Sequence, residues 1–211
     1  MGTLNVSNLN HTGNTFTTSA DLNLSGSWTN APTGTQVKYG AYYTGHGVGA
    51  RIVSASTSWS TVNINGTNQH GENIGKASDD VLTFSKLSNR SHLEVSIFFP
   101  VYLAGGTGGG GIRCMASHDS GSNYHLLSNL QQGPFNGWGA FGYGGNDAES
   151  LVYTWNTSDN LSHRNTWKTK TGECRIYFET RVWTTDNTVY LIDYNVDYQK
   201  VGKVIIREII H

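Results

Sequence analysis

The segment 91–117 constrains the fold more than any other part of the chain. Every second residue over 93–103 is apolar, and this period of two is typical of a β-strand with one buried face. The loop 105–111 is glycine at six of its seven positions, and a second alternating run follows at 112–116. The pattern predicts a long hairpin with a glycine tip in the middle of a β-sandwich. Pro100 has no N–H to donate, so we expect it at a bulge or on an exposed edge.

The chain from residue 37 onward shows the same strand-like pattern. The composition, with 26 Gly and 3 Pro, is typical of strands joined by tight turns, and no helical period extends over three turns. The candidate strands span residues 37–44, 49–55, 60–65, 81–87, 91–103, 112–117, 124–128, 138–143, 151–155, 173–184, 189–194 and 203–209. We therefore predict an all-β fold, an antiparallel β-sandwich or jelly roll.

Residues 1–36 form a different kind of segment, with few apolar residues among Asn, Thr, Ser and Gly. Such a segment becomes ordered only against its own domain or against neighbouring chains. We predict an extended N-terminal arm over 1–36 and a β-sandwich domain over 37–211. The first residues show no basic stretch followed by an apolar run, so we expect no signal peptide. No apolar stretch approaches the roughly 20 residues of a membrane helix, so we expect no membrane insertion.

The charge and motif content argue against several functions. Charged residues make up 14% of the chain and the net charge is −1, without the basic stripe of a nucleic-acid binder. The glycine loop matches G-x-G-x-x-G but precedes a strand and not a helix, which argues against a dinucleotide site. The adjacent residues of 117–119, Ser-His-Asp, cannot reach relay geometry, and no pair of carboxylates converges. We expect no catalytic residues and no enzymatic activity.

Metal sites and disulfides have little support in the sequence. The eight histidines show no pair at metal-ligand spacing, so we expect neither a metal nor a cofactor. Asp193, Asn195 and Asp197 share one side of a predicted strand, which is either a Ca²⁺ site or a polar strand edge. Cys114 and Cys174 fall within alternating strands, where buried free thiols are favoured over a disulfide.

Aromatic residues cluster in a segment that is also rich in Gly, Asn and Asp, PFNGWGAFGYGGNDAESLVYTWN. Aromatic rings beside amides and carboxylates can hold sugars by stacking and hydrogen bonds, whereas the alternative is ordinary core packing. The candidate glycan or receptor contacts are Trp138, Tyr143, Tyr153, Trp155 and Trp167.

The C-terminal third predicts a second hairpin with its turn at 186–187. One side of its first strand carries arginines and aromatics, which form either cross-strand pairs or a subunit contact. The final strand, 203–210, is apolar on both sides and must be covered on both, centrally in the sandwich or by a sister chain. The candidate subunit-interface residues are Arg175, Tyr177, Arg181, Trp183, Ile206 and Ile209.

Four separate motifs carry a resemblance to a known group of proteins. They are the opening GTLNVSNLN, the FFPVY strand before a glycine-rich turn, the passage NGWG…GYGG…YTWN, and the ending KVIIREI. With these motifs the chain resembles the C-terminal domains of tail-fibre and related virion surface proteins of marine and cyanobacterial phages. The resemblance implies a homotrimeric β-sandwich knob on a virion, which binds a host cell-surface glycan or protein.

The resemblance leaves the position on the virion open. Residues 1–36 would attach the knob to other virion proteins, and the chain has no extended shaft. It would therefore be a short spike, a fibre tip or a head decoration protein. Two other classes are a monomeric secreted carbohydrate-binding module and a glycan depolymerase. The absence of paired carboxylates weakens the depolymerase hypothesis.

Overall fold

Thirteen strands and one short helix make up the described part of the chain. The computed structural model describes residues 33–43, 51–54, 56–62, 64, 80–105, 109–129, 138–141, 148–158, 163–184, 187–191 and 202–211. The predicted arm therefore lies outside the described residues up to residue 32, and the first strand begins at Gln36.

The strands form two antiparallel sheets, which we call sheet A and sheet B. Sheet A has the order β1-β13-β5-β10-β8, and β12 joins β5 and β2 beyond the end of β13. Its members are β1 (Gln36–Tyr43), β2 (Arg51–Ser54), β5 (Ser91–Gly105), β8 (Ser128–Asn129), β10 (Ala148–Asn156), β12 (Asn187–Leu191) and β13 (Lys203–Ile210).

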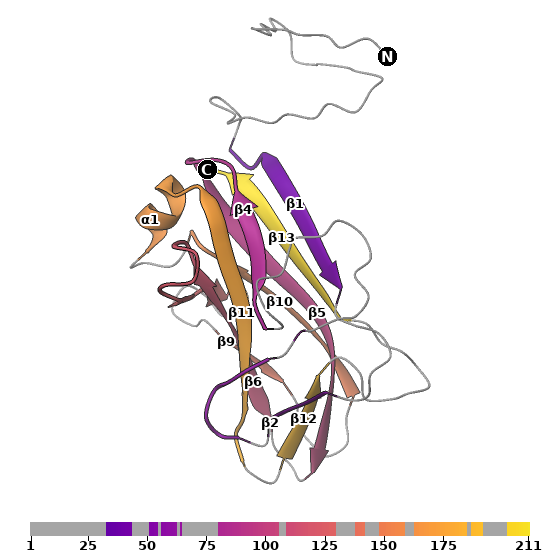
Figure 1. The fold of residues 1–211 in the computed structure, drawn as a ribbon. Helices are drawn as coiled ribbons and strands as arrows, with labels where there is room; N and C mark the ends of the chain where they lie inside the picture. Colours follow the sequence, from indigo (N-terminus) through magenta and orange to yellow (C-terminus); the bar gives the residue numbers. More distant parts are fainter. Residues whose placement is uncertain are drawn as a thin grey trace, which may run out of the picture.

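Sheet B has the order β3-β11-β6-β7, with β4 also paired to β11 and β9 also paired to β6. Its members are β3 (Ser60–Thr61), β4 (Leu82–Lys86), β6 (Gly110–Ser117), β7 (His125–Leu126), β9 (Trp138–Phe141) and β11 (Gly172–Val182). In Figure 1, β4 and β11 lie in front of β5 and β10, so the two sheets form two layers. The all-β, antiparallel sandwich predicted from the sequence is confirmed.

The helix α1 (Arg164–Thr169) was not predicted. It has six residues, fewer than two turns, so no amphipathic period can develop along it. Trp167 is fully buried and anchors the helix to the core, and the amide N–H of Trp167 donates to the carbonyl of His163.

Both predicted hairpins are wrong. β5 belongs to sheet A and β6 to sheet B, so the glycine-rich connection passes from one sheet to the other. The same holds for β11 of sheet B and β12 of sheet A. An alternating pattern identifies the buried side of a strand but not its hydrogen-bonded partner. Two strands whose apolar sides face each other across a sandwich have the same pattern as a hairpin.

The core lies between the two inner surfaces. β5 contributes every second residue from Leu93 to Val101, as predicted for this part of the strand, and β11 contributes its own alternating set from the opposite sheet. The rings of Phe99 on β5 and Phe178 on β11 meet edge to face with centroids 5.7 Å apart. Trp155 on β10 lies 6.0 Å from the same Phe178 ring. The three rings join the two sheets at the centre of the sandwich.

Pro100 occupies a gap between two partners of β5. On one side of β5, β13 pairs with residues 91–98 and β12 pairs with residues 101–105. Pro100 falls between these two ranges, where the missing N–H costs no ladder hydrogen bond on that side. On the other side it stands opposite Ser150 of β10. The predicted bulge or sheet edge is therefore replaced by a change of partner within a central strand.

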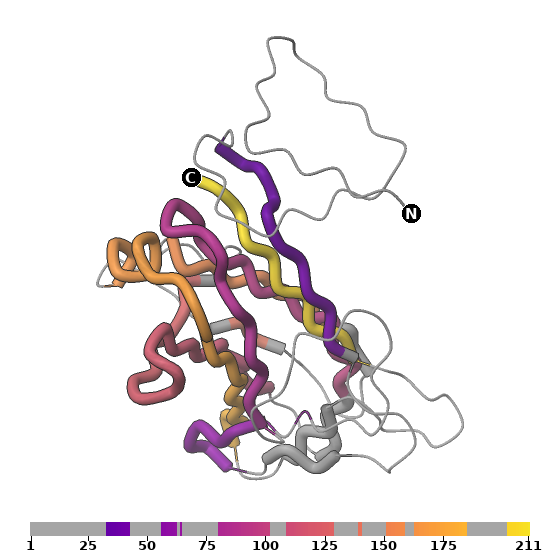
Figure 2. Tube along the Cα trace, turned by 45° about the horizontal axis from the view of Figure 1, so that its top comes forward, coloured from indigo at the N-terminus to yellow at the C-terminus, as the bar shows by residue number. Residues whose placement is uncertain are grey.

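The C-terminal strand β13 lies inside sheet A, between β1 and β5. Figure 2 shows β1 and β13, from the two ends of the described chain, side by side. Ile206 is fully buried in the core of the chain itself. The prediction that Ile206 forms a subunit contact is therefore wrong, because the sandwich already covers it.

A buried polar cluster joins the two sheets near the end of β13. Glu208 points inward and is fully buried, where it accepts hydrogen bonds from Leu87 N (2.9 Å), Ser88 N (2.6 Å) and the Ser91 hydroxyl (2.6 Å). Lys86 of β4 is also buried, and its ammonium donates to the carbonyls of Ser88, Lys168 and Lys170. Burial lowers the pKa of Lys86, while the nearby Glu208 carboxylate raises it.

The two cysteines are free and buried, as predicted. Burial raises the pKa of Cys174 to about 12 and raises the pKa of Cys114 well above its ordinary value. Because the thiolate is the reactive form, we expect neither cysteine of the native protein to react with a thiol reagent such as Ellman's reagent at pH 8. Both should react after unfolding in guanidinium chloride. Rapid reaction of either thiol in the native protein would contradict this burial.

Candidate functional surface on sheet B

The outer side of β11 carries the arginine and aromatic residues predicted to be an interface. The buried side of the strand alternates with partly exposed residues, as the period of two requires. Arg175, Tyr177 and Arg181 are partly exposed, and Trp183, just beyond the strand, is 45% exposed. These four side chains therefore lie on or beside one outer surface, which we call the sheet B surface.

Trp59 is a central residue of the sheet B surface. The guanidinium groups of Arg113 and Arg181 lie 4.4 Å and 4.8 Å from the centre of its ring. Arg113 also forms an ion pair with Glu179, which is directly opposite it on the neighbouring strand β11. Stacking of two cations on one indole, together with one carboxylate, holds this part of the surface in a fixed arrangement.

The other end of the sheet B surface is also internally paired. The rings of Tyr124 and Tyr177 meet edge to face at 4.7 Å, and Arg175 forms an ion pair with Glu173 at 2.8 Å. Ring contacts and ion pairs of the kind expected by the first interpretation are therefore present on this side, including the cross-strand pair of Arg113 and Glu179. They do not remove the alternative interpretation, because rigid arginines and aromatics are also the residues enriched in the centres of interfaces.

A cavity opens at the Trp183 end of the sheet B surface. It has a volume of about 280 Å³ and is lined by Thr57, Arg181, Val182 and Trp183. The Nε atom of Arg181 is buried and has no hydrogen-bond partner in the described structure. The cavity thus combines an exposed indole, a hydroxyl and a guanidinium group.

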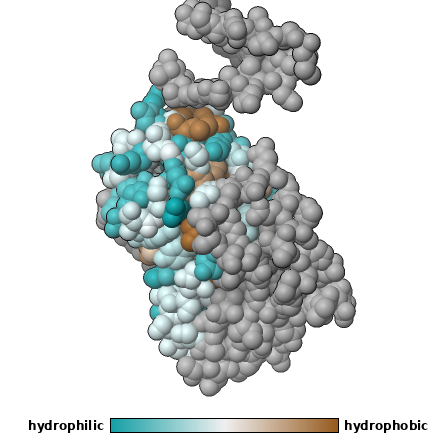
Figure 3. Space-filling model, viewed as in Figure 1, coloured by the Kyte–Doolittle hydropathy of each residue, from teal (hydrophilic) through white to brown (hydrophobic). Residues whose placement is uncertain are grey.

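Figure 3 shows the side of the molecule on which β4 and β11 lie. The described residues there are mainly hydrophilic or neutral, with small hydrophobic areas. Overall hydropathy does not distinguish an interface from the rest of a protein surface, so the residue types on this side carry the argument.

Most of the aromatics predicted to contact a glycan do not lie on a described surface. Trp155 and Trp167 are fully buried, so the prediction is wrong for both, because core packing covers their rings. Tyr153 packs against the core, and its hydroxyl donates to the carbonyl of Ala140. The side chain of Trp138 and the whole of Tyr143 lie outside the described residues.

Gly139 explains part of the aromatic segment. A Cβ atom at Gly139 would lie 2.4 Å from the Tyr153 ring, a distance that real Cβ atoms do not show. Gly139, the second glycine of the NGWG passage, is therefore required for the ring of Tyr153 to cross the backbone of β9. The motif serves packing at this position.

Sequence reasoning missed two groups of residues. Trp59 and Arg113 lie in separate segments, and only the pairing of β3, β11 and β6 brings them to Arg181. The fold also gathers His118, His125 and His163, although no two of them have metal-ligand spacing in the sequence. The row of Asp193, Asn195 and Asp197 lies outside the described residues, so its two interpretations stay open.

The predicted interface residues do not share one surface. Ile209 is partly exposed on β13 of sheet A, where it stands opposite His92 and Gln36. The four residues of the sheet B surface lie on the other layer. A subunit interface formed by the sheet B surface would therefore not include Ile209.

Comparisons with known proteins identify no family for this chain. No family model matches the chain, and no curated protein is similar to it. Among solved structures, the chain is similar to the CBM22-1 and GH10 modules of endo-1,4-β-D-xylanase 10B from Clostridium thermocellum in complex with xylohexaose. The identity is 16%, the TM-score is 0.27, and the match covers 77% of this chain but only 28% of the xylanase chain. The one helix among the described residues is too short to span a membrane.

Proposed function

We propose that the chain is a non-enzymatic virion surface protein that assembles as a homotrimer through the sheet B surface. The observation that carries the proposal is the row of Arg175, Tyr177, Arg181 and Trp183, which ends in an indole that is 45% exposed. The resemblance of the four sequence motifs to phage tail-fibre and related proteins supports the same class. Attachment to a host surface glycan or protein is the role of such a knob.

The rigidity of the sheet B surface supports its proposed role as a subunit interface. The side chains of Trp59, Arg113 and Glu179 already hold one another in place. They would therefore lose little conformational entropy when another subunit binds. In a cyclic trimer each copy presents one patch to a different patch of the next copy. The exposed Trp183 is then the anchor, with Arg181 as the polar group beside it, and Arg175 adds a second polar group at the other end of β11.

Attachment to the particle would depend on the predicted arm. Residues 1–36 would bind other virion proteins, as a short tail fibre or spike, or alternatively as a head decoration protein. Gly34 N donates to Ile210 O (2.8 Å) and Ile210 N donates to Thr35 O (2.9 Å), so residues from Thr33 onward extend the pairing of β1 with β13.

We predict that a chain beginning at Thr33 folds but does not enter virus particles. Removal of the first 32 residues leaves every described pairing of β1 intact, so the far-UV circular dichroism of the shortened chain should match that of the full chain. Incorporation is measured by the protein content of purified particles. Normal incorporation of the shortened chain would contradict the attachment role of the arm.

A second candidate function is carbohydrate binding by a monomer, and the cavity beside Trp183 favours it. An exposed indole next to Arg181 and Thr57 offers a stacking face and hydrogen-bond donors, which shallow sugar sites use. A glycan array probed with the full chain and with Trp183→Ala tests this function. Binding by a monomer that is lost in the variant would favour it over the trimer.

A further inference from the structure

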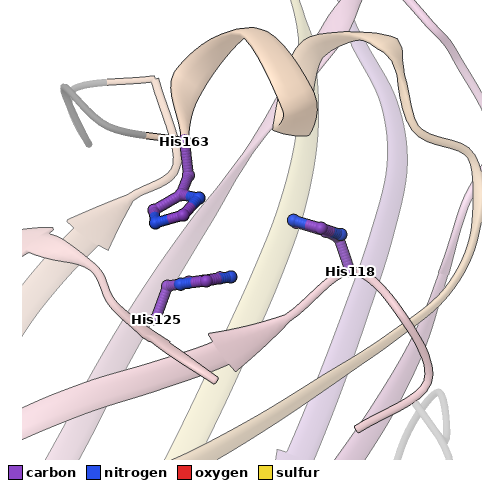
Figure 4. A group of neighbouring side chains, drawn as sticks. All are labelled: His118, His125 and His163. Atoms are coloured by element: carbon purple, nitrogen blue, oxygen red, sulfur yellow. The ribbon is translucent and has the colours of Figure 1, made fainter. Parts of the chain in front are cut away.

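Three histidines from three separate segments meet at the edge of sheet B. His118 follows the end of β6, His125 lies on β7, and His163 immediately precedes α1. Figure 4 shows their imidazole rings directed toward one another. One potential ligand atom from each residue lies within 4.8 Å of those of the other two. Among the residues that the structure describes, no other three His, Cys, Asp or Glu residues form such a group.

We propose that His118, His125 and His163 bind one divalent transition-metal ion of the zinc class. Three nitrogen ligands around one open position is an arrangement known for protein-bound zinc. With Zn–N bonds of about 2.0–2.1 Å, the nitrogens around a tetrahedral ion are about 3.3–3.4 Å apart. The ligand atoms must move closer by about 1.5 Å at most, and one of the stacked His125 and His163 rings must turn, because an imidazole binds a metal in its own ring plane.

The surroundings of the rings are consistent with ligand function. The rings of His125 and His163 stack with centroids 3.5 Å apart, and His118 lies 5.5 Å from His125. Three imidazoles this close cannot all be protonated without strong repulsion. Burial is the largest cause that lowers the pKa of His118 and His125, neighbouring imidazoles lower it further, and the Asp119 carboxylate acts in the opposite direction without cancelling the shift. Neutral imidazole is the form that binds a metal.

Two buried polar atoms, one in the cluster and one beside it, are without hydrogen bonds. They are Nδ1 of His118 and Nε1 of Trp167, whose rings meet edge to face at 5.1 Å. A buried polar atom without a partner costs about 1–3 kcal/mol, so a purely structural role gives no reason to place polar rings here. Ordinary core packing would be better served by apolar side chains.

The ion would have a structural effect that follows from the three elements. β6 and β7 belong to sheet B, whereas α1 is held mainly by Trp167 and by the contacts of Lys86 with its last carbonyls. A metal bound by His163 at the start of the helix and by His118 and His125 on the sheet would fasten α1 to the edge of the sandwich. Three protein ligands leave one position for water or another small ligand.

The test uses the untagged full chain, freed of metal by a chelator and then titrated with Zn²⁺ and, separately, with Co²⁺. We expect one ion per chain by calorimetry and the strong visible absorption of tetrahedral Co²⁺. Loss of an outer partner of a ligand costs 10–100-fold in metal affinity, so loss of a ligand in His125→Gln should cost at least about 100-fold. His118→Gln should have the same effect.

His211→Gln is the matched control, because it removes a part-exposed histidine outside the cluster. It should bind Zn²⁺ as the unchanged chain does. Zn²⁺ should also raise the melting temperature of the unchanged chain and of this control, but not that of His125→Gln. The proposal is overturned if the unchanged chain binds no ion stoichiometrically. It is equally overturned if folded His118→Gln and His125→Gln, checked by circular dichroism, retain the full affinity.

Discussion

Replacement of Trp155 by alanine is expected to lower the free energy of unfolding by about 3–5 kcal/mol, the cost typical of removing a buried aromatic side chain. Trp155 is fully buried, and its ring packs beside Tyr153 (5.9 Å) and Phe178 (6.0 Å), so it contacts both sheets. The loss is a large part of the total stability of a domain, which is about 5–15 kcal/mol. Urea denaturation at a fixed protein concentration measures it.

Val152→Ala is the matched control for this change. Val152 lies on the same strand, β10, but on the outer side, where it is 50% exposed. A surface substitution of this kind usually changes stability by less than about 0.5 kcal/mol. Equal effects of the two substitutions would contradict the burial of Trp155 between the sheets, and with it the correction of its predicted glycan role.

Glu208→Leu is expected to destabilise the protein by about 3–5 kcal/mol, because the buried carboxylate is the acceptor for three donors and the nearest counter-charge of Lys86. The leucine cannot accept hydrogen bonds, so the N–H groups of Leu87 and Ser88 and the hydroxyl of Ser91 would be left unpaired. The same urea experiment measures the loss.

The control for this prediction is Glu94→Leu on the adjacent strand β5. Glu94 is partly exposed, and its carboxylate lies 3.7 Å from Nε2 of His92, a contact that is a partly exposed ion pair when His92 is protonated. Such pairs contribute about 0–1 kcal/mol, so the control should stay close to the unchanged chain. If Glu208→Leu were as stable as Glu94→Leu, the buried polar cluster would not contribute to holding the two sheets together.

The strands could be predicted because their signal is local. On β11 the alternation of buried Ile176 and Phe178 with partly exposed Tyr177 and Glu179 is present in the sequence itself. The partner of a strand is not local information, which is why the two predicted hairpins were wrong. The last strand illustrates the same limit. Its two apolar sides required cover, but only the structure shows that β1, β5 and sheet B supply it for Ile206.

The candidate sites depend even more on long-range pairing. Arg175, Tyr177, Arg181 and Trp183 were found because they alternate on one strand. Trp59 and the three histidines were missed because each comes from a separate segment. An aromatic-rich composition could not distinguish a binding surface from a core, since Trp155 and Trp167 satisfy the same pattern and are buried.

The solution mass of the purified full chain, measured by light scattering, tests the central claim most directly. The chain has a mass of 23.0 kDa, and the account predicts an assembly of three chains. It also predicts that Trp183→Ala yields folded monomers while Val152→Ala, exposed on the opposite sheet, remains trimeric. A monomer at all accessible concentrations would contradict the predicted trimer. A trimer that Trp183→Ala leaves unchanged would contradict the claim that the sheet B surface is the subunit interface.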